Sequence, residues 1–122
     1  MGWVRDGGFA SVLGLRPQLY ADYRAFEDAV CGALDPRLIE LCRARVAYLL
    51  GGQATAIEPA TDCERACLRL ADKFVLDPHG VDDADTAAVA AHLPPPTMVA
   101  LIEALALFDG FTRFRLILGV ED

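Results

Sequence analysis

Helical periodicity constrains this chain more than any other feature of its sequence. Apolar residues recur three or four positions apart in segment after segment, as they do on the buried face of an amphipathic helix. No segment alternates apolar and polar residues as a strand would, and none is repeated or of low complexity. The segments with helical periodicity are 16–33, 36–50, 61–76, 81–93 and 97–119. We therefore expect one all-α domain over residues 1–122, folded as a compact bundle of about five helices.

Several of these segments begin and end at residues that suit a helix terminus. Asp35–Pro36 provides an N-cap followed by a first-turn proline, and Gly51–Gly52 provides a C-terminal stop. Thr61 with Glu64 three residues later has the spacing of a capping box. The last segment is the most apolar, and we expect Gly110 to interrupt it and to permit the close approach of another helix or a ligand.

The composition predicts self-association and disfavours two classes of partner. Apolar residues make up 54% of the chain, more than a monomer of this size can easily bury, so we expect part of them to lie between subunits of a homo-oligomer. The formal net charge of −7 has the wrong sign for a phosphate-binding surface. Nucleic acid and anionic membranes are therefore not expected as partners.

The sequence also gives no signal for membrane insertion or export. No stretch reaches the roughly 18 uninterrupted apolar residues that a transmembrane helix needs. The segment "MGWVRDGGFA" lacks the basic start and apolar centre of a signal peptide, and Asp6 stands where a myristoylation signal has Ser or Thr. We expect a cytoplasmic protein.

The cysteines and histidines do not form a recognisable metal site. Cys63 and Cys67 lie four residues apart on one helix face, where a disulfide is geometrically awkward. The two histidines are distant from these cysteines in sequence, which disfavours zinc, and His79 reads as a turn residue. We interpret the cysteines as packing residues, with a redox pair at Cys63 and Cys67 as the alternative, and we expect no metal or cofactor.

Two groups of charged residues have both a structural and a functional interpretation. Asp109 and Arg113 are spaced for a helical ion pair in apolar surroundings, so this pair either fixes the helix or provides an arginine that binds an anion. Arg37, Glu40 and Arg43 form a polar stripe on the second helix. This stripe is either a solvated face or holds a carboxylate, Glu40, for proton transfer.

Two stretches of the chain resemble a known family. "LDPRLIELCRARVAYLLGG" resembles the segment of carboxymuconolactone decarboxylase and alkyl hydroperoxidase D-like proteins that leads into their C-x-x-C pair. "ADKFVLDPHGVDD" followed by "MVALIEALALFDGFTRFRLILGV" resembles the later half of the same family. The resemblance covers roughly residues 17–120 and implies a small all-α domain that assembles into dimers, trimers or hexamers.

The resemblance also implies that the thiol chemistry of this family is missing here. Glu40 falls at the position of the family's glutamate, but Gly52 and Thr55 fall where its hydroperoxidase members have their two cysteines. Ala54 and Pro59 fall where histidines are expected. A peroxidatic cysteine must be an activated thiolate, which neither Gly52 nor Thr55 can supply.

Three hypotheses about function follow. The first is a cofactor-free lyase or isomerase of a small, carboxylated organic molecule, with Glu40 as acid/base, Arg113 as anchor and Asp109 orienting that arginine. The expected substrate contacts are Tyr48, Thr55 and Phe108. The second is a thiol-dependent peroxidase or oxidoreductase that uses Cys63 and Cys67 instead. The third is a catalytically silent oligomeric module that binds a ligand or a protein.

Overall fold

The computed structural model describes residues 8–52 and 55–120, and every regular element in these ranges is helical. The helices are α2 (Phe9–Leu13), α3 (Pro17–Gly32), α4 (Pro36–Leu49), α5 (Asp62–Leu76), the short 3₁₀ helix η1 (Pro78–Gly80), α6 (Asp83–Ala90) and α7 (Pro95–Leu118). The all-α prediction is therefore confirmed, with six α-helices in the described ranges instead of about five.

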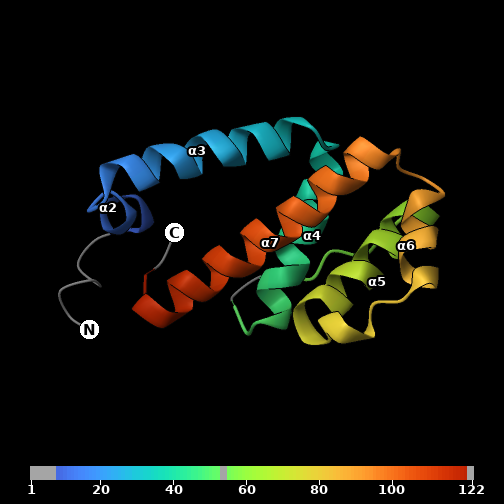
Figure 1. Cartoon of the computed structure of the whole chain (residues 1–122). Helices are drawn as coiled ribbons and strands as arrows, with labels where there is room; N and C mark the ends of the chain where they lie inside the picture. Colours follow the sequence, from blue (N-terminus) through green and yellow to red (C-terminus); the bar gives the residue numbers. More distant parts are fainter. Residues whose placement is uncertain (1–7, 53–54, 121–122) are drawn as a thin grey trace.

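Helices α4 and α7 form the centre of the arrangement. Helix α4 packs against both α5 and α7, and α6 packs mainly against α5. On the other side of this centre, α3 packs against α7, and α2 packs against α3 (Figure 1). The molecule thus has one part built from α4 to α7, and a second part where α2 and α3 meet the later turns of α7.

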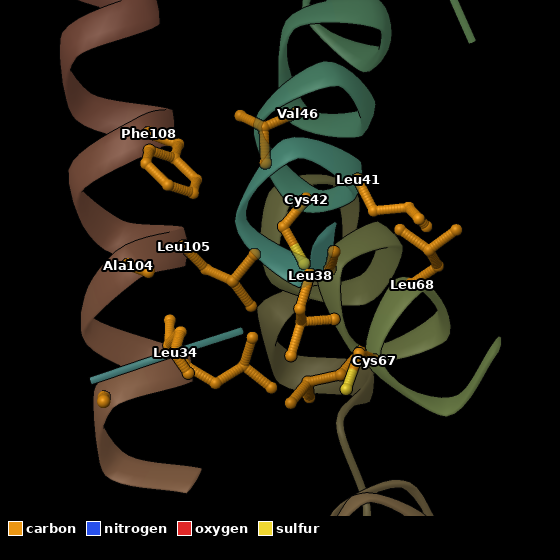
Figure 2. Packing of buried hydrophobic residues seen from close by; sticks show 14 of the residues in the cluster. Leu34, Leu38, Leu41, Cys42, Val46, Cys67, Leu68, Ala104, Leu105 and Phe108 are labelled. Carbon is orange, nitrogen blue, oxygen red and sulfur yellow. The ribbon is translucent and has the colours of Figure 1, made fainter. Parts of the chain in front are cut away.

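The main core lies where α4, α5 and α7 meet. Helix α4 contributes a stripe of buried side chains at helical spacing, which faces buried residues of α5 and α7 (Figure 2). The residues of this core with at most 1% of their surface exposed are Leu41, Cys42, Val46, Cys67, Ala71, Val89, Leu101, Ala104 and Leu105. A second, smaller cluster of Phe9, Leu13 and Val120 joins α2 to the C-terminal end of α7.

The helix caps follow the sequence prediction closely. The Asp35 carboxylate accepts a hydrogen bond from the Arg37 backbone N–H at 2.8 Å, as an N-cap does. The Thr61 hydroxyl accepts one from the Glu64 N–H at 3.1 Å. The Glu64 carboxylate accepts a hydrogen bond from the Ala60 N–H at 2.7 Å, so it anchors the residue before the cap.

Two ion pairs connect neighbouring helices. The Arg45 guanidinium on α4 donates hydrogen bonds to both carboxylate oxygens of Asp72 on α5, at 2.6 and 2.9 Å. The Lys73 ammonium on α5 lies 2.6 Å from the buried Asp85 carboxylate on α6 and also donates to the Gly80 carbonyl at 3.1 Å. These pairs fix α5 between its two neighbours.

The structure adds one helix that the sequence did not predict and corrects the expectation about Gly110. Phe9–Leu13 forms a helix that is too short to show a clear sequence period. Helix α7 continues through Gly110 without a break, because Phe108 before this residue is buried in the main core and Phe111 after it packs against the same core. A Cβ atom at Gly110 would meet nothing within 4 Å, so this glycine does not mark the close approach of another helix.

Some sequence expectations fall outside the described residues. They are those on Ala54, one of the positions where the family resemblance leads us to expect a histidine, and on the segment 1–7. Within the described part of the chain, no single helix is long and apolar enough to cross a membrane. Helices α6 and α7 taken together are long and apolar enough, but the chain bends by 119° between them.

The glycines of α4 and α7 yield opposite predictions for stability. Gly51 has φ of 80°, where an alanine is strained, so Gly51→Ala should lower the free energy of unfolding by about 1 kcal/mol. Gly110 is an exposed helical residue with free space at its Cβ position, so Gly110→Ala should raise the free energy of unfolding by roughly 0.5–1 kcal/mol. Urea denaturation of both variants measures the effects, and a destabilised Gly110→Ala variant would contradict the continuous α7.

Candidate functional site

The larger cavity of the described structure, of about 730 Å³, lies between α3, α4 and the second half of α7. Its apolar wall comes mostly from α7, with Leu107, Phe108, Phe111 and Leu116. Its polar lining comes from all three helices, with Tyr23, Glu27, Arg43, Thr112 and Arg115. A cavity with an apolar wall and a few converging polar groups is the usual form of a small-molecule site.

Helix α3 supplies a hydrogen-bonded pair of acidic groups. Tyr23 and Glu27 lie one helical turn apart, and the Tyr23 hydroxyl donates to the Glu27 carboxylate over 2.7 Å. Burial of the phenol, followed by its hydrogen bond to Glu27, raises the pKa of Tyr23, while Arg115 acts in the opposite direction. Tyr23 is therefore a neutral donor at physiological pH and holds the Glu27 carboxylate in one orientation.

Arg43 on α4 faces this pair across the cavity. Its Nη1 atom lies 3.9 Å from the Glu27 carboxylate, and its Nη2 atom donates to the Cys31 sulfur over 3.8 Å. The guanidinium also lies over the Phe108 ring, 4.7 Å from the ring centre. Arg43 is thus held between a carboxylate and an aromatic face.

Arg115 on α7 has a similar aromatic neighbour. Its guanidinium lies over the Phe9 ring at 3.9 Å from the ring centre, and its Nη1 atom donates a long hydrogen bond, 3.4 Å, to the Phe111 carbonyl. The N–H donors of a guanidinium lie in its plane, whereas stacking on a ring uses its face. Each of the two guanidinium groups therefore lies over an aromatic ring, and each has further N–H groups that could donate hydrogen bonds to an anion.

The arrangement combines an excess of positive charge with a group that can transfer protons. Two arginines and one glutamate line the cavity, so its lining is net positive in a chain of formal charge −7. A carboxylate ligand can pair with a guanidinium through charge-assisted hydrogen bonds. Glu27 lines the same cavity and is a group that could accept or donate a proton there.

A smaller cavity of about 360 Å³ lies where α6 meets α7, lined by residues 90–95 and Met98. His92 is the one polar side chain of its lining, and the other lining residues are alanine, leucine, proline and methionine. This cavity therefore offers no group of converging polar side chains.

Several residues proposed from the sequence lie apart from the larger cavity. Glu40 is exposed on α4, and among the described residues no ion pair or hydrogen bond reaches its side chain. Tyr48 is 54% exposed, and Thr55 is also exposed. None of the three lines the cavity.

The proposed residues of α7 are divided between two faces of the helix. Phe108 is buried and lines the cavity. Arg113 donates from Nε to both oxygens of Asp109 at 3.1 Å, on a face of α7 that does not line the cavity. The arginine that does line the cavity is Arg115, two residues later and therefore about 200° around the helix.

Part of the cavity lining could have been predicted from helical spacing in the sequence. Phe108, Phe111 and Arg115 follow one another at intervals of three and four, and Tyr23 and Glu27 are four apart. Each set is one stripe of a helix. Which stripes of different helices face each other, however, depends on the packing of α3 against α7.

Gly52 lies at the end of α4, where the resembling family has a cysteine. Gly52 itself lines the cavity, and a Cβ atom at this position would lie 2.9 Å from the Ala47 carbonyl oxygen. The backbone N–H of Gly52 donates to that same oxygen at 2.7 Å. This tight turn is therefore shaped for glycine, and any side chain would require the backbone to move.

The four cysteines are all free thiols. Cys42 and Cys67 are buried in the main core, as expected for packing residues (Figure 2). Burial raises the pKa of Cys42 to about 12 and, together with neighbouring Cys63, raises the pKa of Cys67. Such thiols stay protonated near neutral pH, which disfavours a redox role for the Cys63–Cys67 pair.

Metal binding has no evident place in the described part of the chain. Within residues 8–52 and 55–120, no three histidine, cysteine, aspartate or glutamate side chains come together in a way that could hold a metal ion. His79 lies exposed in η1, as its position in a turn predicted.

No family model matches this sequence, and comparisons with curated proteins and with solved structures find no match either. The resemblance to the carboxymuconolactone decarboxylase and alkyl hydroperoxidase D-like family therefore stays a hypothesis.

The burial of the thiols predicts two classes of reactivity. At pH 8, a thiol reagent should modify the partly exposed Cys31 and Cys63 first and leave Cys42 and Cys67 unmodified until the protein unfolds. Mass spectrometry of the labelled peptides, with and without denaturant, measures this order. Rapid modification of native Cys67, or hydroperoxide turnover that is lost in Cys67→Ser, would favour the redox alternative.

Proposed function

We propose that the cavity between α3, α4 and α7 binds a small organic anion, and that the protein is a cofactor-free lyase or isomerase acting on it by proton transfer. The observation that carries this proposal is the pair of stacked arginines, Arg43 and Arg115, which line the same cavity as the Tyr23–Glu27 pair. The resemblance to a family with decarboxylase members supports the reaction class.

Each residue has a separate role in this proposal. Arg43 and Arg115 bind the carboxylate of the substrate, whose apolar body lies against Phe108 and Phe111. Glu27 transfers the proton, and Tyr23 keeps its own proton and orients Glu27. The partly apolar wall of the cavity makes such charged contacts stronger than they would be in bulk water.

The proposal replaces Glu40 by Glu27 as the acid/base residue. The family resemblance favours Glu40, but its side chain is exposed to solvent and does not line the cavity. Likewise, Arg113 is already paired with Asp109, whereas Arg115 is turned toward the cavity. The two glutamates and the two arginines therefore form matched pairs for an experiment.

Glu27→Gln should lower turnover by about 100-fold, because it keeps the shape of the side chain but removes the titrating proton. Glu40→Gln should retain turnover. The assay follows deuterium incorporation and decarboxylation by NMR in D₂O, above the uncatalysed rate, with a panel of unsaturated lactone carboxylates and 3-oxo acids. Binding is measured with benzoate, for which Arg115→Gln should weaken affinity at least about tenfold and Arg113→Gln should not.

Three other outcomes have distinct meanings. Activity that is lost in Glu40→Gln and kept in Glu27→Gln would move the site to the exposed face of α4. Benzoate binding without turnover of any panel compound would favour the silent binding module. No binding of benzoate to the wild-type protein would contradict the anion site itself.

The proposal also includes an alkyl hydroperoxidase D-like arrangement of the helices and assembly into a homo-oligomer. It is supported by large apolar side chains that remain exposed in one chain, among them Leu15, Leu19 and Phe26 near or on α3 and Ile117 at the end of α7. Cytoplasmic location without nucleic-acid or membrane partners belongs to the same proposal and rests on the sequence.

Light scattering coupled to gel filtration should therefore show a dimer, trimer or hexamer. Leu19→Asp should shift the distribution toward monomer, because a charge on this exposed position of α3 would be buried at an interface. Ala84→Asp, at an exposed small residue of α6, serves as the control for a surface charge alone. A monodisperse monomer for the wild type would contradict the assembly.

A further inference from the structure

Two buried side chains, Phe9 and Leu13, connect helix α2 to the rest of the molecule. Phe9 is only 6% exposed, although it begins a helix of five residues near the start of the described chain. Its ring makes edge contacts with three other rings, those of Tyr23 at 5.3 Å, Phe111 at 5.8 Å and Phe114 at 5.9 Å between ring centres. Phe9 itself does not line the larger cavity.

The face of the same ring holds Arg115. The guanidinium carbon lies 3.9 Å from the centre of the Phe9 ring, closer than Arg43 lies to the ring of Phe108 at 4.7 Å. The remaining direct hydrogen bond of Arg115, to the Phe111 carbonyl, is long at 3.4 Å. The Phe9 ring and the neighbouring Tyr23 hydroxyl therefore both constrain the orientation of this guanidinium.

A defined plane matters because arginine is a long side chain with many rotamers. A free arginine must give up much of its rotamer freedom to hold one orientation, and an arginine already held gives up less on binding. The edge contacts of Phe9 to Tyr23 and Phe111 also tie its position to the other side of the cavity.

We infer that Phe9 is a positioning residue for Arg115, and that helix α2 is therefore part of the anion-binding site although it does not touch the ligand. This inference rests on the proposed anion site. It adds that affinity for the charge of the ligand, and not for its apolar body, depends on the aromatic ring at position 9.

Binding and the docking of α2 are then linked in both directions. An anion that uses Arg115 in its stacked orientation stabilises the Phe9 contact, and the Phe9 contact strengthens anion binding by the same factor. Benzoate should accordingly slow hydrogen exchange of the Val12 amide, whose N–H donates to the Gly8 carbonyl in the first turn of α2 at 3.0 Å.

The test compares Phe9→Leu with Phe9→Tyr, which keeps the ring, and with Phe114→Leu as the matched control. Phe114 belongs to the same aromatic cluster, yet no arginine stacks on its ring among the described residues. Affinities are measured for benzoate and for benzyl alcohol, which has a similar apolar body without the charge. Phe9→Leu should weaken benzoate about fivefold and change benzyl alcohol by less than twofold. Phe9→Tyr and Phe114→Leu should stay within about twofold of the wild type for both ligands.

A second measurement needs no ligand. A guanidinium over a ring face has an upfield-shifted Nε–H resonance, so the Arg115 signal should be shifted in the wild type, in Phe9→Tyr and in Phe114→Leu, and unshifted in Phe9→Leu. Loss of affinity for both ligands in Phe9→Leu and Phe114→Leu alike would mean that the ring only packs, and would overturn the inference. An unshifted Arg115 resonance in the wild type would overturn it as well.

The two proposals fail in different ways. A wild-type protein that shows the shifted Arg115 resonance but binds no benzoate would refute the anion site and keep the positioning of Arg115 by Phe9. A protein that binds benzoate through Arg115 and is insensitive to Phe9→Leu would keep the anion site and refute the role of α2.

Discussion

The packing of α7 against α4 supports the rest of the structure. Helix α7 spans 24 residues, about 36 Å. Its first half packs in the core, and its second half lines the cavity. Ala100 and Ala104 bring its first half close to the core, where Leu101 and Leu105 are fully buried. Because the helix is continuous, this packing also fixes the direction of its second half, which carries the aromatic wall and Arg115 to the cavity. A break in the middle of α7 would separate the core from the site.

The electrostatics of the cavity differ from those of the whole chain. The protein carries a formal charge of −7, but two guanidinium groups and one carboxylate line this cavity. Both cations lie over aromatic rings, Arg43 over Phe108 and Arg115 over Phe9. An arrangement of this kind favours an anionic ligand over a neutral one of equal size.

The sequence predicted the helices well because their ends are set by local chemistry. Asp35 and Thr61 act as N-caps where the pattern put them, since a capping side chain bonds to a backbone only two or three residues away. The site was harder to predict because it depends on which helix faces meet. The spacing of Asp109 and Arg113 indicated an ion pair, and these two residues do pair with each other. The neighbours of Arg115 in the cavity lie on α2 and α3, which are distant from it in sequence, so its position could not be predicted from local spacing.

The central claim is that an anion binds between α4 and α7, and the arginine side chains can report this directly. In a titration with benzoate followed through the arginine Nε–H resonances, the signals of Arg43 and Arg115 should shift together and saturate at one dissociation constant. The signal of Arg113, paired with Asp109 on another face of α7, should stay in place. Movement of Arg113 with no change at Arg43 and Arg115 would contradict the account.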